Sequence, residues 1–141
     1  MTAVSDIEHD HTEGLHDAPM TDPRGQTIDQ GLIVRFMGAC IDGCDLCQAA
    51  LLAQFETDAT ATARVVELAC IATQHMFDGL PENMTDPDCD TTAVPVAFRR
   101  ITAAGLDGNT VRMYQLAESL TGEERREAVE AAARILVMID I

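Results

Sequence analysis

The sequence contains no lysine and no tryptophan, and only 4% of its residues are aromatic. A core with so few rings must be built from aliphatic side chains, methionine and cysteine, a composition that suits helices better than sheets. All 9 basic residues are arginines, against 24 acidic residues, which gives a net charge of -15. Because such a surface repels phosphate groups, we expect no direct binding to nucleic acid, whereas a basic protein partner fits the charge.

Long apolar runs are also absent, since no stretch approaches the roughly eighteen residues that a membrane span needs. The N-terminus is acidic from Asp6 onward and lacks the basic start of a secretory leader. We therefore predict a cytoplasmic protein with no membrane contact. The 5 cysteines are an odd number, which argues against a disulfide framework and favours free thiols in a reducing compartment.

The first 26 residues have little apolar content and hold two prolines and three of the four histidines, His9, His11 and His16. Such a segment cannot bury enough apolar surface to order itself. We predict a flexible acidic tail over residues 1–26 and a single helical domain over residues 27–141, because the chain has the size of one ordinary domain.

The domain is predicted to begin with a long helix. Thr27 and Gln30 have the spacing of a capping box, and no proline follows before Phe55. Apolar side chains recur at helical spacing along this stretch, namely Ile33, Met37, Cys40, Cys44, Cys47 and Leu51. The pattern predicts one helix from residue 27 to about residue 55.

A second helix is predicted to start at Thr57 or Asp58 and to stop at Asp78 and Gly79. It is apolar on nearly every side, which is typical of a helix in the centre of a bundle. We expect it to form an antiparallel hairpin with the first helix. The polar stretch that follows, up to Pro95, is longer than most connections in compact domains.

Three further helices are predicted in the remainder. One covers residues 96–104 and ends at Gly105, one covers residues 110–120, and the last begins at a capping box formed by Thr121 and Glu124. Its expected buried stripe consists of Ala128, Ala132, Ile135 and Ile139. The fold class is therefore all-α, a small bundle of four to five helices with a central antiparallel helical hairpin.

The cysteines are the main chemical signal. If the hairpin turns near residue 57, Cys44 and Cys70 are equally far from the turn and meet across it, with Cys40 and Cys47 on the same face and His75 at the margin. These five side chains include enough soft ligands for Zn, Cu or an iron–sulfur cluster. The CIxxCxxC spacing of residues 40–47 resembles that of the cysteine-rich four-helix copper-storage proteins, which line all their core helices with thiols, whereas this chain has none in its C-terminal helices.

Two other interpretations of the same thiols remain open. Free cysteine often serves as a small buried hydrophobe, and three ligands spaced four and three residues apart span about 10 Å of helix, too far for one ion. Cys44 and Cys47 also have the spacing of a redox dithiol. Asp42 and Asp45 flank them and disfavour the thiolate, which argues against dithiol catalysis.

We predict a small acidic, non-enzymatic helical protein that acts by protein–protein interaction or assembly, as a structural component or regulator, with a protein partner or as a homo-oligomer and without a cofactor. The alternative is a thiolate metal-binding bundle that uses Cys40, Cys44, Cys47 and Cys70. The apolar second helix supports the first hypothesis, because four or five helices are too few to cover it on every side. The paired arginines Arg99–Arg100 and Arg125–Arg126 are expected to form internal salt bridges.

Overall fold

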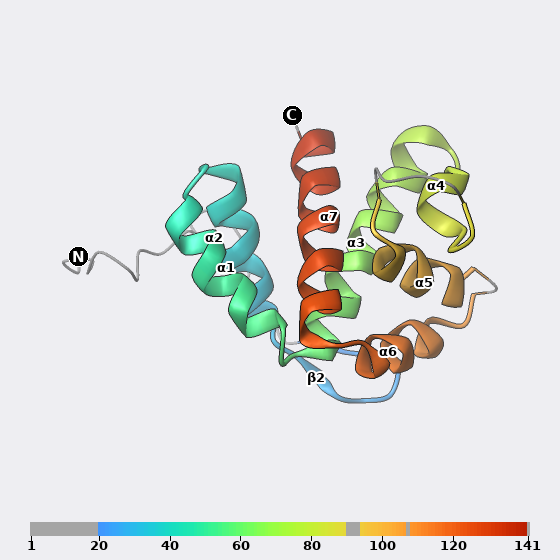
Figure 1. Cartoon of the computed structure of the whole chain (residues 1–141), viewed down its shortest axis with the longest axis horizontal. Helices are drawn as coiled ribbons and strands as arrows, with labels where there is room; N and C mark the ends of the chain where they lie inside the picture. The colour runs from blue at the N-terminus through green and yellow to red at the C-terminus, as the bar shows by residue number, and fades with distance from the viewer. Residues whose placement is uncertain (1–19, 90–93, 107, 141) are drawn as a thin grey trace.

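A computed structural model describes residues 20–89, 94–106 and 108–140, which form seven helices and one pair of two-residue strands (Figure 1). The predicted all-α class is confirmed. The helices outnumber the four or five predicted, because the first predicted helix is two helices and the long polar stretch contains a short one. The elements are β1 (Met20–Thr21), β2 (Thr27–Ile28), α1 (Gln30–Ile41), α2 (Asp45–Phe55), α3 (Ala59–Phe77), α4 (Glu82–Thr85), α5 (Val96–Ala104), α6 (Thr110–Ser119) and α7 (Gly122–Asp140).

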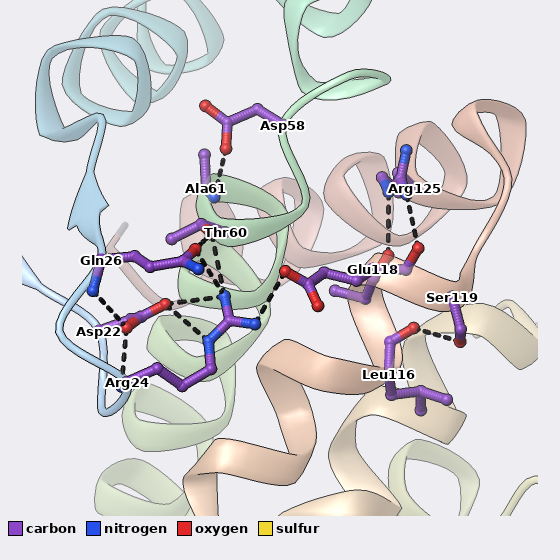
Figure 2. Close-up of polar contacts among 11 residues, drawn as sticks. Asp22, Arg24, Gln26, Asp58, Thr60, Ala61, Leu116, Glu118, Ser119 and Arg125 are labelled. Carbon is purple, nitrogen blue, oxygen red and sulfur yellow. Dashed lines mark hydrogen bonds and ion pairs between the residues drawn. The ribbon is translucent and has the colours of Figure 1, made fainter.

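The predicted tail lies outside the described residues as far as residue 19, but residues 20–26 belong to the folded domain. β1 and β2 pair antiparallel, and the turn between them is held by Asp22, whose carboxylate accepts hydrogen bonds from the backbone N–H groups of Arg24 and Gln26 at 2.8 and 2.9 Å. The Arg24 guanidinium bonds Asp22 and Glu118 of α6 (Figure 2). It also lies 5.8 Å from the ring centre of Tyr114. The hairpin is thereby attached to the helices.

The first helix begins later than predicted. The Asp29 carboxylate accepts from the backbone N–H of Leu32 at 3.0 Å and caps α1, whereas Thr27 lies in β2 opposite Thr21. The predicted Thr27–Gln30 capping box is therefore wrong, because the strand pairing takes up Thr27 and the carboxylate two residues on supplies the cap.

The predicted single helix up to residue 55 is also wrong. The chain breaks at residues 42–44, where Gly43 has a φ of 71° and donates to the Cys40 carbonyl at 3.2 Å, while Cys44 donates to the Ala39 carbonyl at 2.9 Å. This pair of hydrogen bonds is a Schellman motif, which ends a helix at a left-handed glycine. α1 and α2 consequently fold back on each other as a hairpin of their own (Figure 1).

The other predicted helix ends are confirmed. Asp58 caps α3 through a 3.0 Å hydrogen bond from a backbone N–H three residues on, and α3 ends at Asp78, which has a φ of 56°. Gly105 follows α5 directly. Both hydrogen bonds of the Thr121–Glu124 box form. The backbone N–H of Thr121 donates to the Glu124 carboxylate at 2.9 Å, and the backbone N–H of Glu124 donates to the Thr121 hydroxyl at 3.1 Å.

The core surrounds α3 and α7, which run side by side in the same direction (Figure 1). α3 makes its most extensive contact with α7 rather than with the preceding helix, so the predicted central hairpin is not confirmed. The rings of Phe36 of α1 and Phe55 of α2 pack edge to face with their centroids 5.2 Å apart, and both join the α1–α2 hairpin to the core. Tyr114 of α6 is 1% exposed and donates its hydroxyl hydrogen to Glu67 of α3 at 2.8 Å.

Arg125 joins the start of α7 to the C-terminal ends of α2 and α6. Its guanidinium donates to the backbone carbonyls of Ala117 and Glu118, both at 2.9 Å, and of Glu56 at 2.7 Å (Figure 2 shows part of this set). The predicted internal role of this arginine is confirmed, although its partners here are carbonyls. None of the helices in the described part of the chain has both the length and the hydropathy that a membrane span requires.

Candidate functional site

An open apolar groove of about 1010 Å³ lies where α3 and α7 end. One wall is the last turn of α3, the turn after it and α4, and the other is the C-terminal half of α7, which stands apart from α4 in Figure 1. The lining residues are mostly aliphatic side chains and methionines. They are Thr73, Met76, Phe77, Gly79, Leu80, Pro81, Asn83, Met84, Val94, Ala131, Arg134, Ile135, Met138 and Ile139.

Three of the largest apolar side chains of the groove are exposed to solvent. Met76 is 57% exposed, Phe77 68% and Met138 73%. Single exposed apolar residues are ordinary on protein surfaces, but a contiguous apolar patch marks an interaction site more often than chance. The exposed side chains from α3 and α7 face the same groove, so they form one such patch.

Local backbone chemistry shapes the wall of the groove that includes the end of α3. Asp78 has a left-handed backbone conformation, with a φ of 56°, and ends α3. Pro81 then precedes the single turn of α4, and Met84 anchors that turn with only 5% of its surface exposed. The exposed last turn of α3 and this short helix therefore contribute to the same wall.

A buried arginine fixes the wall formed by Val94. Arg99 of α5 is 3% exposed, and its Nε donates to the Val94 carbonyl at 3.0 Å. Its Nη1 donates to the carbonyls of Asp86, Pro87 and Cys89 at 3.0, 3.1 and 2.9 Å. Arg99 is internal as predicted, but these partners are backbone carbonyls, whereas a salt bridge was predicted. One guanidinium thus holds the middle of the long polar stretch to the part of it that precedes α5.

The groove has an acidic border. Asp78 and Glu82 are exposed, and each stands in the sequence between two residues that line the groove. Arg134 is charged and lines the groove, and it also lines an adjoining hollow of about 410 Å³ that contains Glu127 and Glu130. The surroundings of the apolar surface are therefore predominantly negative, in keeping with the net charge of the chain.

Asn83 contributes a polar group to the same wall. Its Oδ1 atom is buried, and it accepts no hydrogen bond within the described residues. Buried side-chain oxygens normally have a partner. The side-chain amide therefore has unused hydrogen-bonding capacity at the groove.

A second hollow, of about 430 Å³, lies between the α1–α2 hairpin and the other side of α7. Phe36 and Cys40 of α1 and Gln48 of α2 contribute to it. Arg134 and Met138 line this hollow as well as the larger groove, so the C-terminal half of α7 separates the two.

The structure places the five predicted metal ligands in different surroundings. Cys40 is half-buried, and burial raises the pKa of its thiol to about 11. Cys70 faces α5, where its Sγ lies 3.4 Å from Thr102 Oγ1, and burial raises the pKa of this thiol despite that contact. His75 is exposed in the last turn of α3. The sulfur of Cys44 contacts Cys47 within the same turn of α2.

The helix break is the physical reason for this dispersion. A continuous helix was expected to align Cys40, Cys44 and Cys47, but the turn at Gly43 separates Cys40 from the other two. In the part of the chain that the structure describes, no group of three or more His, Cys, Asp or Glu side chains is arranged to hold a metal ion. The metal-binding hypothesis stays a prediction, because the described residues do not bring such a set of ligands together.

The groove was not predicted from the sequence. Met76 and Phe77 end α3 directly after the polar residues Gln74 and His75, so the last turn gives no clear signal of an apolar surface. Which part of that helix stays uncovered depends on the position of α4 and α7, which are distant in sequence. No family model matches the chain, and the comparisons with curated proteins and with solved structures likewise gave no match.

Proposed function

We propose that the chain is a non-enzymatic interaction protein that binds the basic, amphipathic helix of a partner protein in the groove between α3, α4 and α7. The observation that carries this proposal is the exposure of Met76, Phe77 and Met138 along one apolar groove. An amphipathic helix recognises such a groove by inserting side chains spaced three and four residues apart.

The composition of the groove supports a helix rather than a small molecule. Methionine side chains are flexible and polarisable, and they adapt to the shape of a bound apolar surface. Met76, Met84 and Met138 supply three of them from three different helices. The lining also runs over parts of α3, α4 and α7, which gives the groove the extent that a helix needs.

Charge determines which helix fits. The chain carries a net charge of -15, Asp78 and Glu82 border the groove, and Glu127 and Glu130 line the hollow that adjoins it at Arg134. Opposite charges across an interface steer the encounter and disfavour wrong partners. A helix with an apolar face flanked by lysine or arginine is therefore preferred over an acidic one, and nucleic acid is repelled.

A synthetic peptide of leucine and lysine in helical periodicity, with one tryptophan, provides a defined probe. Because the chain has no tryptophan, the emission of the peptide reports its burial without background. We expect a blue shift and saturable binding that weakens as salt is added. A peptide of the same composition in scrambled order, and one with glutamate in place of lysine, should bind at least about tenfold more weakly, a difference of about 1.4 kcal/mol.

Two variants of exposed side chains test the site itself. Met138→Glu and Met76→Glu each place a charge in the groove without disturbing the core, and each should weaken binding by about tenfold, the value of burying one large apolar side chain. Leu106→Glu is the matched control, because Leu106 is 58% exposed and does not line the groove. Equal binding to the Met138→Glu and Leu106→Glu variants would exclude the groove as the site.

Self-association is the competing outcome. Sedimentation equilibrium of the unmodified chain measures it directly, and we expect a monomer. If the chain forms a dimer that the Met138→Glu substitution dissociates, a second copy occupies the groove, and the proposal of a basic partner helix is overturned in favour of assembly.

A further inference from the structure

Cys44 and Cys47 occupy the start of α2. Cys44 is the N-cap residue, with φ and ψ of -86° and 92°, and Cys47 lies in the first helical turn. Residues three positions apart on a helix share a face, and helix geometry places their Cα atoms about 5 Å apart. Disulfides join Cα atoms separated by about 4.4 to 6.8 Å. The backbone therefore has the dimensions of a disulfide while both sulfurs remain thiols.

The two thiols are in contact and differ in access to solvent. The hydrogen bond between the two side chains, together with burial, raises the pKa of Cys47. Cys47 is 4% exposed, whereas Cys44 is only partly buried. A reagent from solvent reaches Cys44 first, and Cys47 stands directly behind it.

The backbone on both sides of Cys44 is fixed. Its N–H closes the Schellman motif at the end of α1, by donating to Ala39 at 2.9 Å, and its carbonyl accepts from Gln48 of α2 at 3.0 Å. Cys44 thus ends one helix and begins the next. A bond between the two sulfurs needs little movement of the chain, so the geometry is prepared in the reduced state.

We propose that Cys44 and Cys47 form a reversible intramolecular disulfide by exchange with an external disulfide. The Cys44 thiol loses its proton to solvent, its sulfur attacks one sulfur of the oxidant, and the first oxidant thiolate leaves with the electron pair of the broken S–S bond. The Cys47 thiol then loses its proton and attacks the Cys44 sulfur in the mixed disulfide, which releases the second thiolate. Both thiolates take up protons, so two electrons and two protons pass from the cysteine pair to the oxidant.

The charges around the pair set the choice of oxidant. The positive end of the α2 dipole favours a thiolate at Cys44, the N-cap residue, whereas Asp42 and Asp45 disfavour it. These two carboxylates are exposed and also repel an oxidant of negative charge. A neutral disulfide such as 2-hydroxyethyl disulfide should therefore react faster than glutathione disulfide, and added salt should reduce the difference.

The other three cysteines that the structure describes lie in surroundings unlike those of the Cys44–Cys47 pair. Cys70 contacts Thr102 of α5, and Cys40 faces the hollow beside α7. Cys89 lies on the stretch that Arg99 holds. They therefore serve as internal references for the reactivity of the pair.

The test uses the full chain, reduced and then exposed to each disulfide, followed by acid quenching, alkylation with N-ethylmaleimide, digestion and mass spectrometry. We expect the peptide with residues 44–47 to lose two hydrogens and to resist alkylation until it is reduced, while Cys40, Cys70 and Cys89 remain open to alkylation. In the Cys47→Ser variant the mixed disulfide should accumulate on Cys44. In the Cys44→Ser variant the buried Cys47 should react about tenfold more slowly than Cys44 does in the Cys47→Ser variant. Circular dichroism confirms that both variants are folded.

Three results would overturn the proposal. The first is full alkylation of both Cys44 and Cys47 after equilibration with excess of either oxidant. The second is a first disulfide that includes Cys40 or joins two chains. The third is equal reactivity of the two serine variants, because Cys44 would then have no role as the entry point.

Discussion

Replacement of Arg99 by methionine tests how the wall of the groove is held. Methionine keeps most of the apolar stem and removes the guanidinium, whose Nε and Nη1 bond four carbonyls at 2.9 to 3.1 Å. These two nitrogens carry three hydrogens, so the four contacts amount to three hydrogen bonds shared among four acceptors. We expect the change to lower stability and to release the polar stretch from α5.

The magnitude follows from the bond count. A hydrogen bond contributes about 1 kcal/mol net, and three bonds give about 3 kcal/mol. Two further effects change this value in opposite directions. The carbonyls of Asp86, Pro87 and Cys89 are on partly exposed residues and regain water, whereas Val94 is 8% exposed and its carbonyl is left without a partner. The free energy of unfolding should therefore fall by about 2 to 4 kcal/mol.

Urea unfolding followed by circular dichroism measures this loss. With an m-value of about 2 kcal/mol/M, the midpoint should fall by about 1 to 2 M. Hydrogen exchange of the amides of Met84 and Cys89 reports the release of the stretch, because their backbone N–H groups bond within it. Arg100→Met is the matched control on the same helix. A loss under about 1 kcal/mol with unchanged exchange would refute the assignment of Arg99 as the residue that holds this wall.

Two further predictions concern the start of the domain and the helix break. Burial opposes ionisation of Asp22, but hydrogen bonds from Arg24 and from the backbone N–H of Gln26 outweigh it and lower the pKa of the carboxyl below 3.8. The carboxylate therefore stabilises the fold above about pH 4, and this contribution to the free energy of unfolding is lost as the pH falls through the lowered pKa. The free energies of unfolding of the wild type and of Asp22→Asn, measured by urea titration, should differ at pH 7 and converge in acid. A difference that stays constant with pH would contradict the assignment. Gly43→Ala forces a side chain into φ 71° and should lower stability by about 1 kcal/mol in the same assay, whereas no loss would mean that the Schellman turn is dispensable.

Most features that depend only on neighbouring residues were predicted correctly from the sequence, the exception being the Thr27–Gln30 capping box. The Asp58 cap, the stop at Asp78, the end of α5 at Gly105 and the Thr121–Glu124 box each need only three or four residues of chain. Their hydrogen bonds close within one turn, so the sequence contains both partners at a fixed spacing. Local chemistry of this kind leaves little for tertiary structure to change.

The errors arose where two local signals competed. Gly43 was compatible with a helix end, but the apolar spacing from Met37 to Leu51 continued across it and indicated a single helix. Glycine weakens a helix interior by only about 1 kcal/mol, so the outcome depended on whether two short helices pack better than one long helix. That comparison involves Phe36 and Phe55, whose edge-to-face contact exists only after the chain has folded back.

The groove could not be predicted because exposure is a property of the assembled fold. Met76 and Phe77 look in the sequence like any buried helix face. Their exposure results from the single turn of α4 and from the end of α7, more than fifty residues further along the chain. The same limit applies to Arg99, whose carbonyl partners are backbone atoms and leave no signal in side-chain type.

Met138 stands between two hollows, and one thioether cannot fill both at once. If a ligand on the α4 side drew this side chain toward it, the space beside Phe36 and Cys40 would widen, and a ligand on that side would have the reverse effect. Thermodynamic linkage requires such an influence to be equal in both directions. The final turns of α7 are therefore the place where binding on one flank of the molecule would change affinity on the other.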